Sequence, residues 1–177
     1  LVNFINLLYN NSIKGGDEMP SILFHELVGY KIASKYKKYD TNNFYLGLMV
    51  PDSVNAYGFA SKENRWRTHR RDKNLDIWQE NVIKFYKENK GKFEETYLAG
   101  YVIHILADII CDRIYQNKLY PKLLEEGYDY NTAYSHYEKG IEKFENSNIN
   151  EDWWKYVKEK FLNGNIEPIC GMDKQMI

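Results

Sequence analysis

The chain is poor in cysteine and proline and has no surplus of charge. Its two cysteines, Cys111 and Cys170, lie far apart and form no CxxC pair, which argues against a disulfide framework and against a thiolate zinc site. The net charge of −1 argues against bulk attraction to nucleic acid or to an anionic membrane. No apolar run is long enough to span a bilayer, and the first residues lack signal-peptide chemistry. We therefore expect a cytoplasmic protein with no transmembrane segment and no sequence-specific contact to nucleic acid.

Residues 1–18 are expected to be a leader that lies outside the folded domain. Back-translated, residues 14–19 can encode a purine-rich bacterial ribosome-binding sequence followed by a start codon, which makes Met19 a candidate for the native start. The richness in Lys, Asn, Ile and Tyr fits an AT-rich bacterial genome. A flexible Gly-Gly linker explains the same residues equally well. The remaining length suits one domain over residues 19–165, followed by a C-terminal tail over residues 166–177.

The spacing of apolar residues predicts an all-α protein, a single-domain helical bundle. Residues 55–71 are rich in glycine, asparagine and charge, and we expect them to form a long irregular segment. No alternating pattern typical of strands is present. The helices are expected over residues 20–38, 40–48, 75–87, 93–114, 130–144 and 153–162, with one helical turn in the connector 119–127.

The most informative stretch is the apolar run 100–108, which contains one histidine and one aspartate. His104 and Asp108 are four residues apart, so they share a helix face and lie close enough to bind one ion. An ionised carboxylate among apolar residues needs a cation or strong hydrogen bonds. Gly100, one turn earlier, leaves room for a neighbouring backbone. The alternative is a core histidine that is hydrogen-bonded to Asp108 alone.

Three further residues join this pair in a recurring order. His25 lies on the inward face of the first helix, Asp52 follows a proline, and His69 follows a threonine. Imidazole and carboxylate groups suit zinc, and ligands drawn from several elements leave positions open for water or substrate. A single loop aspartate or histidine is usually solvated. The ordered combination therefore indicates a catalytic metal site.

This order resembles the bacterial zinc-dependent phospholipase C family, whose all-helical fold is shared with single-strand-specific zinc nucleases. The motifs that carry the resemblance are a histidine, Gly-Leu-Met-Val-Pro-Asp, Thr-His and Gly-Tyr-x-x-His-x-x-x-Asp, between about Met19 and Leu119. The resemblance implies one zinc ion held by Asp52, His69, His104 and Asp108. It also implies a second zinc ion, to which Asp108 bridges and His25 contributes. Secreted members complete this second site with an N-terminal tryptophan, which this chain lacks.

A third zinc site of the family is incomplete in this chain. Ile114 stands at one of its ligand positions, and Gly140 stands four residues after His136, where the family has a glutamate. Asp112 and His136 are the candidates to replace these ligands, with Glu138 or Glu142. An exposed helix position explains His136 as well.

The run 65–73 is strongly basic around His69. Arginine forks suit phosphate oxygens, so Arg67, Arg70 and Arg71 are expected to bind a substrate phosphate, or else they belong to a solvated loop. The function predicted is a zinc-dependent phosphoester hydrolase with a metal-activated water as nucleophile, in which Asp52 also orients or deprotonates that water. Its substrate is a phospholipid headgroup or a small phosphoester. The alternative is a metal-stabilised helical protein that binds a ligand or partner without turnover.

Overall fold

The computed structural model describes residues 21–55, 61–165, 167 and 169. Within these ranges the secondary structure is helical, apart from one isolated bridge between Lys90 and Phe93. The expectation of an all-α fold is therefore confirmed for the part of the chain that is described. The expected leader 1–18, Met19 and most of the expected tail lie outside the described residues.

Most of the expected helices are confirmed within a few residues. The α-helices are α2 (Ile22–Lys35), α3 (Asn42–Met49), α4 (Lys62–Thr68), α5 (Leu75–Asn89), α6 (Glu95–Ile114), α7 (Tyr120–Glu125), α8 (Tyr130–Asn148) and α9 (Glu151–Leu162). Shorter turns lie between them: η1 (Lys37–Tyr39) and η2 (Val50–Asn55) are 3-10 helices, and η3 (Tyr115–Leu119) is a π-helix.

The expectation of an irregular segment over residues 55–71 is wrong for its second half, because residues 62–68 form α4. Ser61 caps this helix by accepting a hydrogen bond from the Asn64 amide at 3.1 Å. α4 has only seven residues, and Thr68 alone is buried. A helix this short and this exposed carries no apolar period, and so its pattern resembled a loop.

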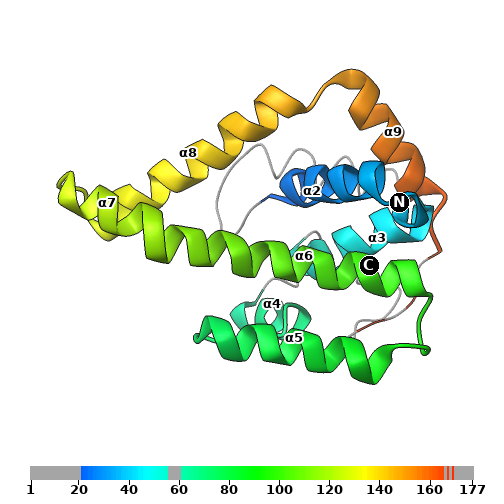
Figure 1. Ribbon diagram of the computed structural model, residues 1–177. Helices are drawn as coiled ribbons and strands as arrows, with labels where there is room; N and C mark the ends of the chain where they lie inside the picture. Colours follow the sequence, from blue (N-terminus) through cyan, green and yellow to red (C-terminus); the bar gives the residue numbers. More distant parts are fainter. Residues whose placement is uncertain (1–20, 56–60, 166, 168, 170–177) are drawn as a thin grey trace.

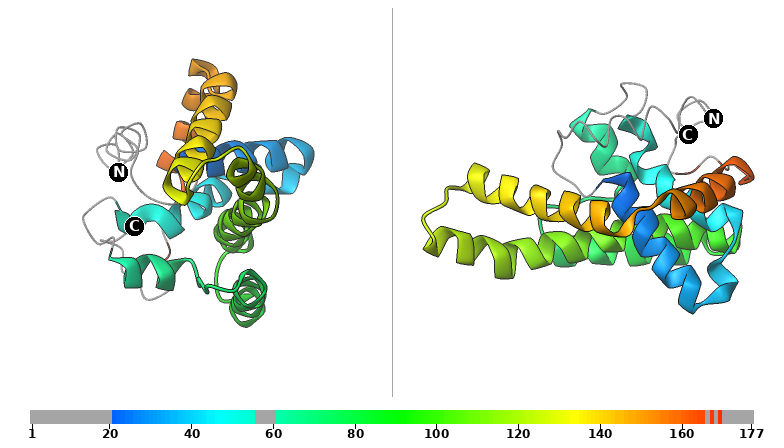
Figure 2. Two further views of the ribbon diagram at one scale, coloured as in Figure 1. Left: turned by 90° about the vertical axis from the view of Figure 1, so that its left-hand side faces the viewer. Right: turned by 90° about the horizontal axis from the view of Figure 1, so that it is seen from above.

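α6 runs through the middle of the molecule, as Figure 1 shows. One apolar cluster joins α2, α3 and α9 on one side of it, and a second cluster joins α5 to α6 itself on the other side. The end of α6 continues through η3 and α7 into α8, which leads away from α6 and back to α2 (Figure 1 and Figure 2). The two sides of α6 therefore bring together residues that are far apart in the sequence.

α3 and α6 cross at two glycines. A Cβ atom on Gly100 would lie 2.2 Å from the Phe44 carbonyl oxygen, and one on Gly47 would lie 2.2 Å from the Tyr97 carbonyl oxygen. The close backbone approach expected at Gly100 is confirmed. Because the backbones touch here, the end of α3 comes within hydrogen-bond distance of the α6 residue His104.

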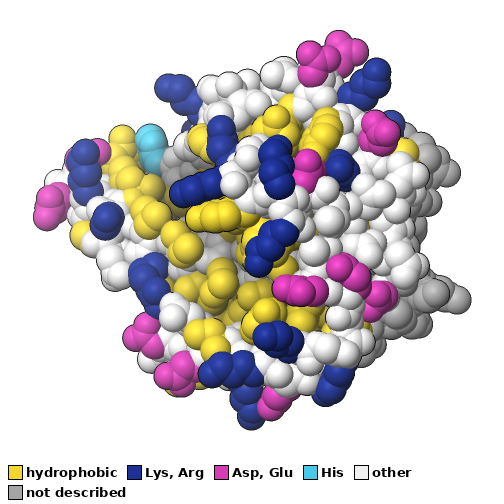
Figure 3. Space-filling model, turned by 45° about the vertical axis from the view of Figure 1, so that its right-hand side comes forward, with side chains coloured by type: hydrophobic (Ala, Val, Ile, Leu, Met, Phe, Trp, Pro, Cys, Tyr) yellow, Lys and Arg dark blue, Asp and Glu magenta, His cyan; other side chains and the backbone are white. Residues whose placement is uncertain are grey.

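The surface carries both charged and apolar side chains. Figure 3 shows hydrophobic side chains gathered across the middle of one face, with Lys, Arg, Asp and Glu around them. Exposed large hydrophobic residues include Ile77 and Ile83 on α5 and Ile110 and Ile114 on α6. Among the described residues, every helix is too short or too polar to cross a bilayer.

Candidate metal centre

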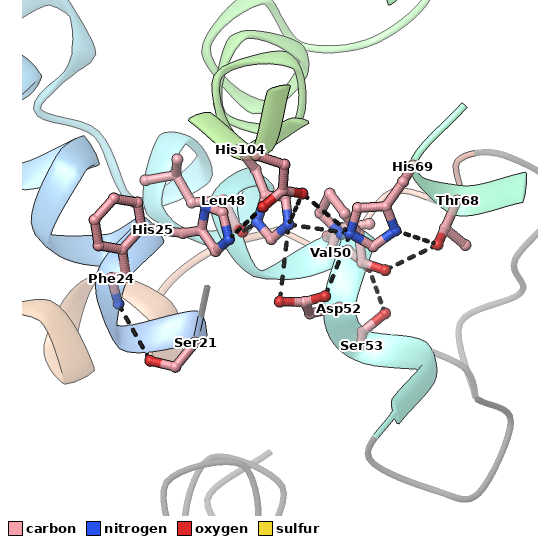
Figure 4. A network of polar contacts seen from close by, with 12 residues as sticks. Ser21, Phe24, His25, Leu48, Val50, Asp52, Ser53, Thr68, His69 and His104 are labelled. Atoms are coloured by element: carbon pink, nitrogen blue, oxygen red, sulfur yellow. Dashed lines mark hydrogen bonds and ion pairs between the residues drawn. The ribbon is translucent and has the colours of Figure 1, made fainter. Parts of the chain in front are cut away.

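Five of the predicted site residues meet in one buried centre. His25 comes from α2, Asp52 from η2, and His69 directly follows α4, while His104 and Asp108 come from α6. Asp52 is 7% exposed and the other four are 0% exposed. Figure 4 shows the side chains of the three histidines and Asp52 pointing toward one another. They form two overlapping groups that could each hold a metal ion: His25, His104 and Asp108, and Asp52, His69 and His104.

The end of α4 is fixed to three other elements, and this fixes His69. The His69 carbonyl accepts a hydrogen bond from the Trp78 indole at 2.7 Å, and the Thr68 carbonyl accepts one from the Tyr101 hydroxyl. The Thr68 hydroxyl donates to the Pro51 carbonyl at 3.0 Å. Since Pro51 precedes Asp52, the same threonine couples the positions of His69 and Asp52.

Main-chain carbonyls orient the two central imidazoles. His69 Nδ1 lies 2.9 Å from the Arg65 carbonyl oxygen, and His104 Nδ1 lies 2.6 Å from the Leu48 carbonyl oxygen. A carbonyl oxygen only accepts, so Nδ1 of each ring carries a proton and Nε2 of a neutral ring presents its lone pair. The two Nε2 atoms lie 3.2 Å apart. This arrangement directs two metal-ligating nitrogens at one point.

Two carboxylates approach the same point. Asp52 Oδ1 lies 3.3 Å from His69 Nε2, and Asp52 Oδ2 lies 3.8 Å from His104 Nε2. Asp108 Oδ2 lies 3.6 Å from both Nε2 atoms. A tetrahedral zinc ion with bonds of about 2.0–2.1 Å separates its ligand atoms by roughly 3.3–3.4 Å. The spacing of these donors therefore fits a zinc ion.

The centre carries negative charge. Burial raises the pKa values of Asp52 and Asp108, but the nearby histidines outweigh it and hold both below the ordinary range. Burial and the charge of His25 lower the pKa of His104 to about 3. Burial alone would lower the pKa of His69, but Asp52 and Asp108 raise it. Two ionised carboxylates thus share this interior with the histidines, and His69 holds a proton more readily than His104 does.

His25 extends the centre on the other side of Asp108. Its Nε2 atom lies 3.2 Å from Asp108 Oδ1, and its ring stacks on the His104 ring with 3.5 Å between centroids. Among the described residues, both ring nitrogens of His25 and both oxygens of Asp108 are buried and have no partner in hydrogen-bond geometry; the ion-pair contact between Nε2 and Oδ1 is their closest approach. Buried polar atoms are normally paired. Cations on both sides of Asp108 would satisfy its two oxygens and His25 Nε2, so the donor set fits metal ions.

Two other predicted ligands lie outside both groups. Asp112 pairs with Arg71, at 2.8 Å between Oδ2 and Nη2. His136 is exposed on α8, where its ring lies against Tyr128 with 4.5 Å between centroids. On the face drawn in Figure 3, histidine is visible only at the projecting end of the molecule.

The three predicted phosphate-binding arginines differ in their contacts. Arg67 is exposed and donates to Asn64 at 3.3 Å. Arg70 has a φ of 54° and lies over the Phe85 ring, 4.3 Å from its centroid. Arg71 lies over the Trp78 ring, 4.7 Å from its centroid, in addition to its contact with Asp112. Arg71 is thus the arginine whose partner is one helical turn from Asp108.

Sequence reasoning missed a buried acid that contacts the start of α2. Glu145 on α8 is 8% exposed and accepts a hydrogen bond from the Ser21 hydroxyl at the start of α2. Burial raises its pKa, and the contacts with Ser21 and His25 oppose that rise. Glu145 stands in a polar helix with the exposed acids Glu138 and Glu142, so no pattern distinguishes it from them.

Comparisons with protein-family models, with curated proteins and with solved structures gave no match. The function of this helical protein with its buried His/Asp centre is therefore inferred from its own side chains.

Proposed function

We propose that this protein is a zinc-dependent phosphoester hydrolase of the phospholipase C type, with one helical domain over residues 19–165. The observation that carries the proposal is the pair of Nε2 atoms on His69 and His104, 3.2 Å apart, with two carboxylates beside them. Imidazole and carboxylate are ligands of catalytic zinc sites. The order of these residues along the chain, which resembles that family, supports the same reading.

Asp52, His69, His104 and Asp108 would hold one zinc ion, and His25 with Asp108 would hold a second. When bound, zinc lowers the pKa of a coordinated water toward neutrality and neutralises charge on a phosphoryl group. Asp108 is the residue that would contribute to both sites, because Oδ1 lies beside His25 and Oδ2 lies beside the other two histidines.

Asp52 is the member of the centre that solvent reaches. Its side chain is 10% exposed, whereas those of the three histidines and Asp108 are 0–1% exposed. Its pKa is lowered, because contacts with His104 and His69 outweigh the effect of burial, so Asp52 is ionised at neutral pH. An ionised carboxylate at the edge of a buried centre is suited to orient an attacking water and to accept its proton. We assign this role to Asp52.

The substrate in this proposal is a small phosphodiester or phosphomonoester, or a phospholipid headgroup, in the cytoplasm. Of the three arginines predicted to bind phosphate, Arg67, Arg70 and Arg71, we propose Arg71 as the contact to the substrate. Arg71 is the best supported, because its partner Asp112 follows Asp108 by one helical turn. A guanidinium fork can hold two non-bridging oxygens of a phosphate.

The test is turnover of bis-p-nitrophenyl phosphate and p-nitrophenyl phosphate by zinc-loaded protein. We expect hydrolysis by the wild type and a loss of about a hundredfold or more in D52N, as for removal of a general base. The matched control is D152N, which changes an exposed aspartate on α9 and should keep wild-type activity. Zinc content is measured for all three proteins, so that loss of the ion is separated from loss of the base.

Deep burial of the centre favours one second candidate, a metal-stabilised helical protein without turnover. Four of the five residues are fully buried, as in a site that closes around a structural ion. Zinc binding without hydrolysis of either phosphoester would establish this second function in place of the first.

A further inference from the structure

Glu145 links α8 to the first turn of α2. Its carboxylate accepts a hydrogen bond from the hydroxyl of Ser21, which is the N-cap of α2. The same Ser21 oxygen lies 3.1 Å from the Leu23 amide and 3.4 Å from the Phe24 amide, and both donate to it. One hydroxyl thus joins the Glu145 carboxylate to the turn that leads into His25.

The backbone of His25 belongs to this capped turn. Its amide donates to the Ser21 carbonyl at 3.3 Å, and Figure 4 shows Ser21 and Phe24 directly beside it. Phe24 also packs against Phe144, the neighbour of Glu145, with 6.0 Å between ring centroids. A displacement of Ser21 would therefore move His25.

The start of α2 also offsets part of the cost of burying the charge of Glu145. It is 8% exposed, and no Lys or Arg of the described chain forms an ion pair with it. The amide groups at the start of a helix carry partial positive charge and stabilise a carboxylate there. The start of α2 thus compensates the charge of Glu145, and Glu145 in turn stabilises that start.

We infer that Glu145 is a positioning residue for the second ion, because it holds the first turn of α2 and thereby His25 against Asp108. This inference rests on the proposed function. The group of Asp52, His69 and His104 does not depend on α2, since these residues come from η2, the end of α4 and α6. Loss of Glu145 should therefore weaken binding of the second ion and leave binding of the first ion nearly unchanged.

The experiment is calorimetric titration of the metal-free full chain with Zn²⁺, with a competing chelator where binding is tight. For E145A we expect the second ion, at His25 and Asp108, to bind at least about tenfold more weakly, as for outer contacts that orient a ligand. The affinity for the first ion, at Asp52, His69 and His104, should change by less than about twofold. E145Q keeps an oxygen that can accept from Ser21 and should restore most of the second affinity. S21A, which removes the hydroxyl, should reproduce E145A.

Two exposed positions supply matched controls, and both variants should bind the two ions as the wild type does. E159A removes an equal charge from α9, and N146A truncates the next side chain along α8. Equal weakening of both ions in E145A and S21A, or no weakening of either, would overturn the inference. A wild-type protein that binds fewer than two zinc ions would overturn the two-ion site itself. That failure is visible in the wild type alone and is therefore distinct from a failure of Glu145.

Discussion

The Nε2 atoms of His69 and His104 face each other at 3.2 Å while their Nδ1 atoms are held by main-chain carbonyls. Two lone pairs repel at this distance, so a metal-free centre needs a proton between the rings. The pKa of His69 is raised by Asp52 and Asp108 against the effect of burial, whereas burial lowers that of His104. Of the two rings, His69 therefore holds a proton more readily, and a bound metal ion would take the place of that proton.

Zinc should stabilise the folded protein through Asp108. A ligand at about 100 times its Kd that binds only the native state adds roughly 2.7 kcal/mol. In a chain of this length that raises Tm by about 5–10 °C. D108A should remove nearly all of this rise and H25A only part of it, because Asp108 faces both groups and His25 only one.

Differential scanning calorimetry with and without Zn²⁺ measures these shifts. D112A is the matched control, since Asp112 lies one turn along α6 and outside both groups. If zinc raised the Tm of D108A as much as that of the wild type, the ion would bind elsewhere in the protein.

Replacing Gly100 by alanine should destabilise the crossing of α3 and α6. The new Cβ atom would lie 2.2 Å from the Phe44 carbonyl oxygen, and main chain cannot rotate away as a side chain can. Overpacking of this kind costs about 1–3 kcal/mol. G140A is the control: nothing lies within 4 Å of a Cβ there, and in the interior of α8 it should add roughly 0.5–1 kcal/mol. Urea unfolding curves that gave the two variants the same stability would contradict this account of the crossing.

Asp40 should stabilise the protein at neutral pH but not in acid. Burial raises its pKa, but hydrogen bonds from Tyr156 and Lys160 outweigh it and lower the pKa below its ordinary value. The Lys160 ammonium lies 3.2 Å from Oδ1. A lowered pKa contributes stability above the unfolded-state pKa of about 3.9, and this is lost as pH falls through the folded-state value.

The free energy of unfolding of the wild type should therefore exceed that of D40N by about 1 kcal/mol at neutral pH. This difference should disappear below about pH 4. Unfolding free energies of both proteins across this range test the sign. A difference that grew on acidification would contradict it. The zinc-induced rise in Tm should be equal in both proteins, because Asp40 is not part of either metal group.

Arg71 should affect substrate turnover more than Arg67. A charge-assisted hydrogen bond contributes roughly 1.5–3 kcal/mol, so R71A should lower kcat/KM for bis-p-nitrophenyl phosphate about ten- to hundredfold. R67A should behave as the wild type, because the Arg67 side chain is exposed and its partner is Asn64 on the same helix. Zinc content should be unchanged in both variants. Wild-type kinetics in R71A would show that phosphate is bound by other residues.

The sequence was most informative where chemistry and periodicity coincide. A histidine and an aspartate four residues apart in an apolar helix predict a shared buried face, and His104 and Asp108 lie on one. Gly100 predicted a close backbone approach, which occurs against Phe44. These features depend on a single helix and its immediate contact, so one sequence suffices to find them.

Features that depend on tertiary partners could not be predicted. The burial of Glu145 comes from the way α8 returns to α2, and nothing in a polar helix encodes that path. The engagement of Arg71 by Asp112 likewise joins residues 41 positions apart. Capping by Ser61 and a hydrogen bond to Trp78 decide the geometry around His69, although its neighbours resemble a loop.

The carbonyls of Arg65 and Leu48 that orient His69 and His104 give this centre a form of mutational robustness. Every residue except proline presents the same carbonyl without changing the backbone path, so neither position needs a particular side chain for this task. Drift at residues 48 and 65 can therefore alter packing or surface charge while both imidazoles keep their tautomer. The backbone conformation, not the side chain at either position, supplies these ring-orienting carbonyls. A comparison of residue types would therefore not detect them.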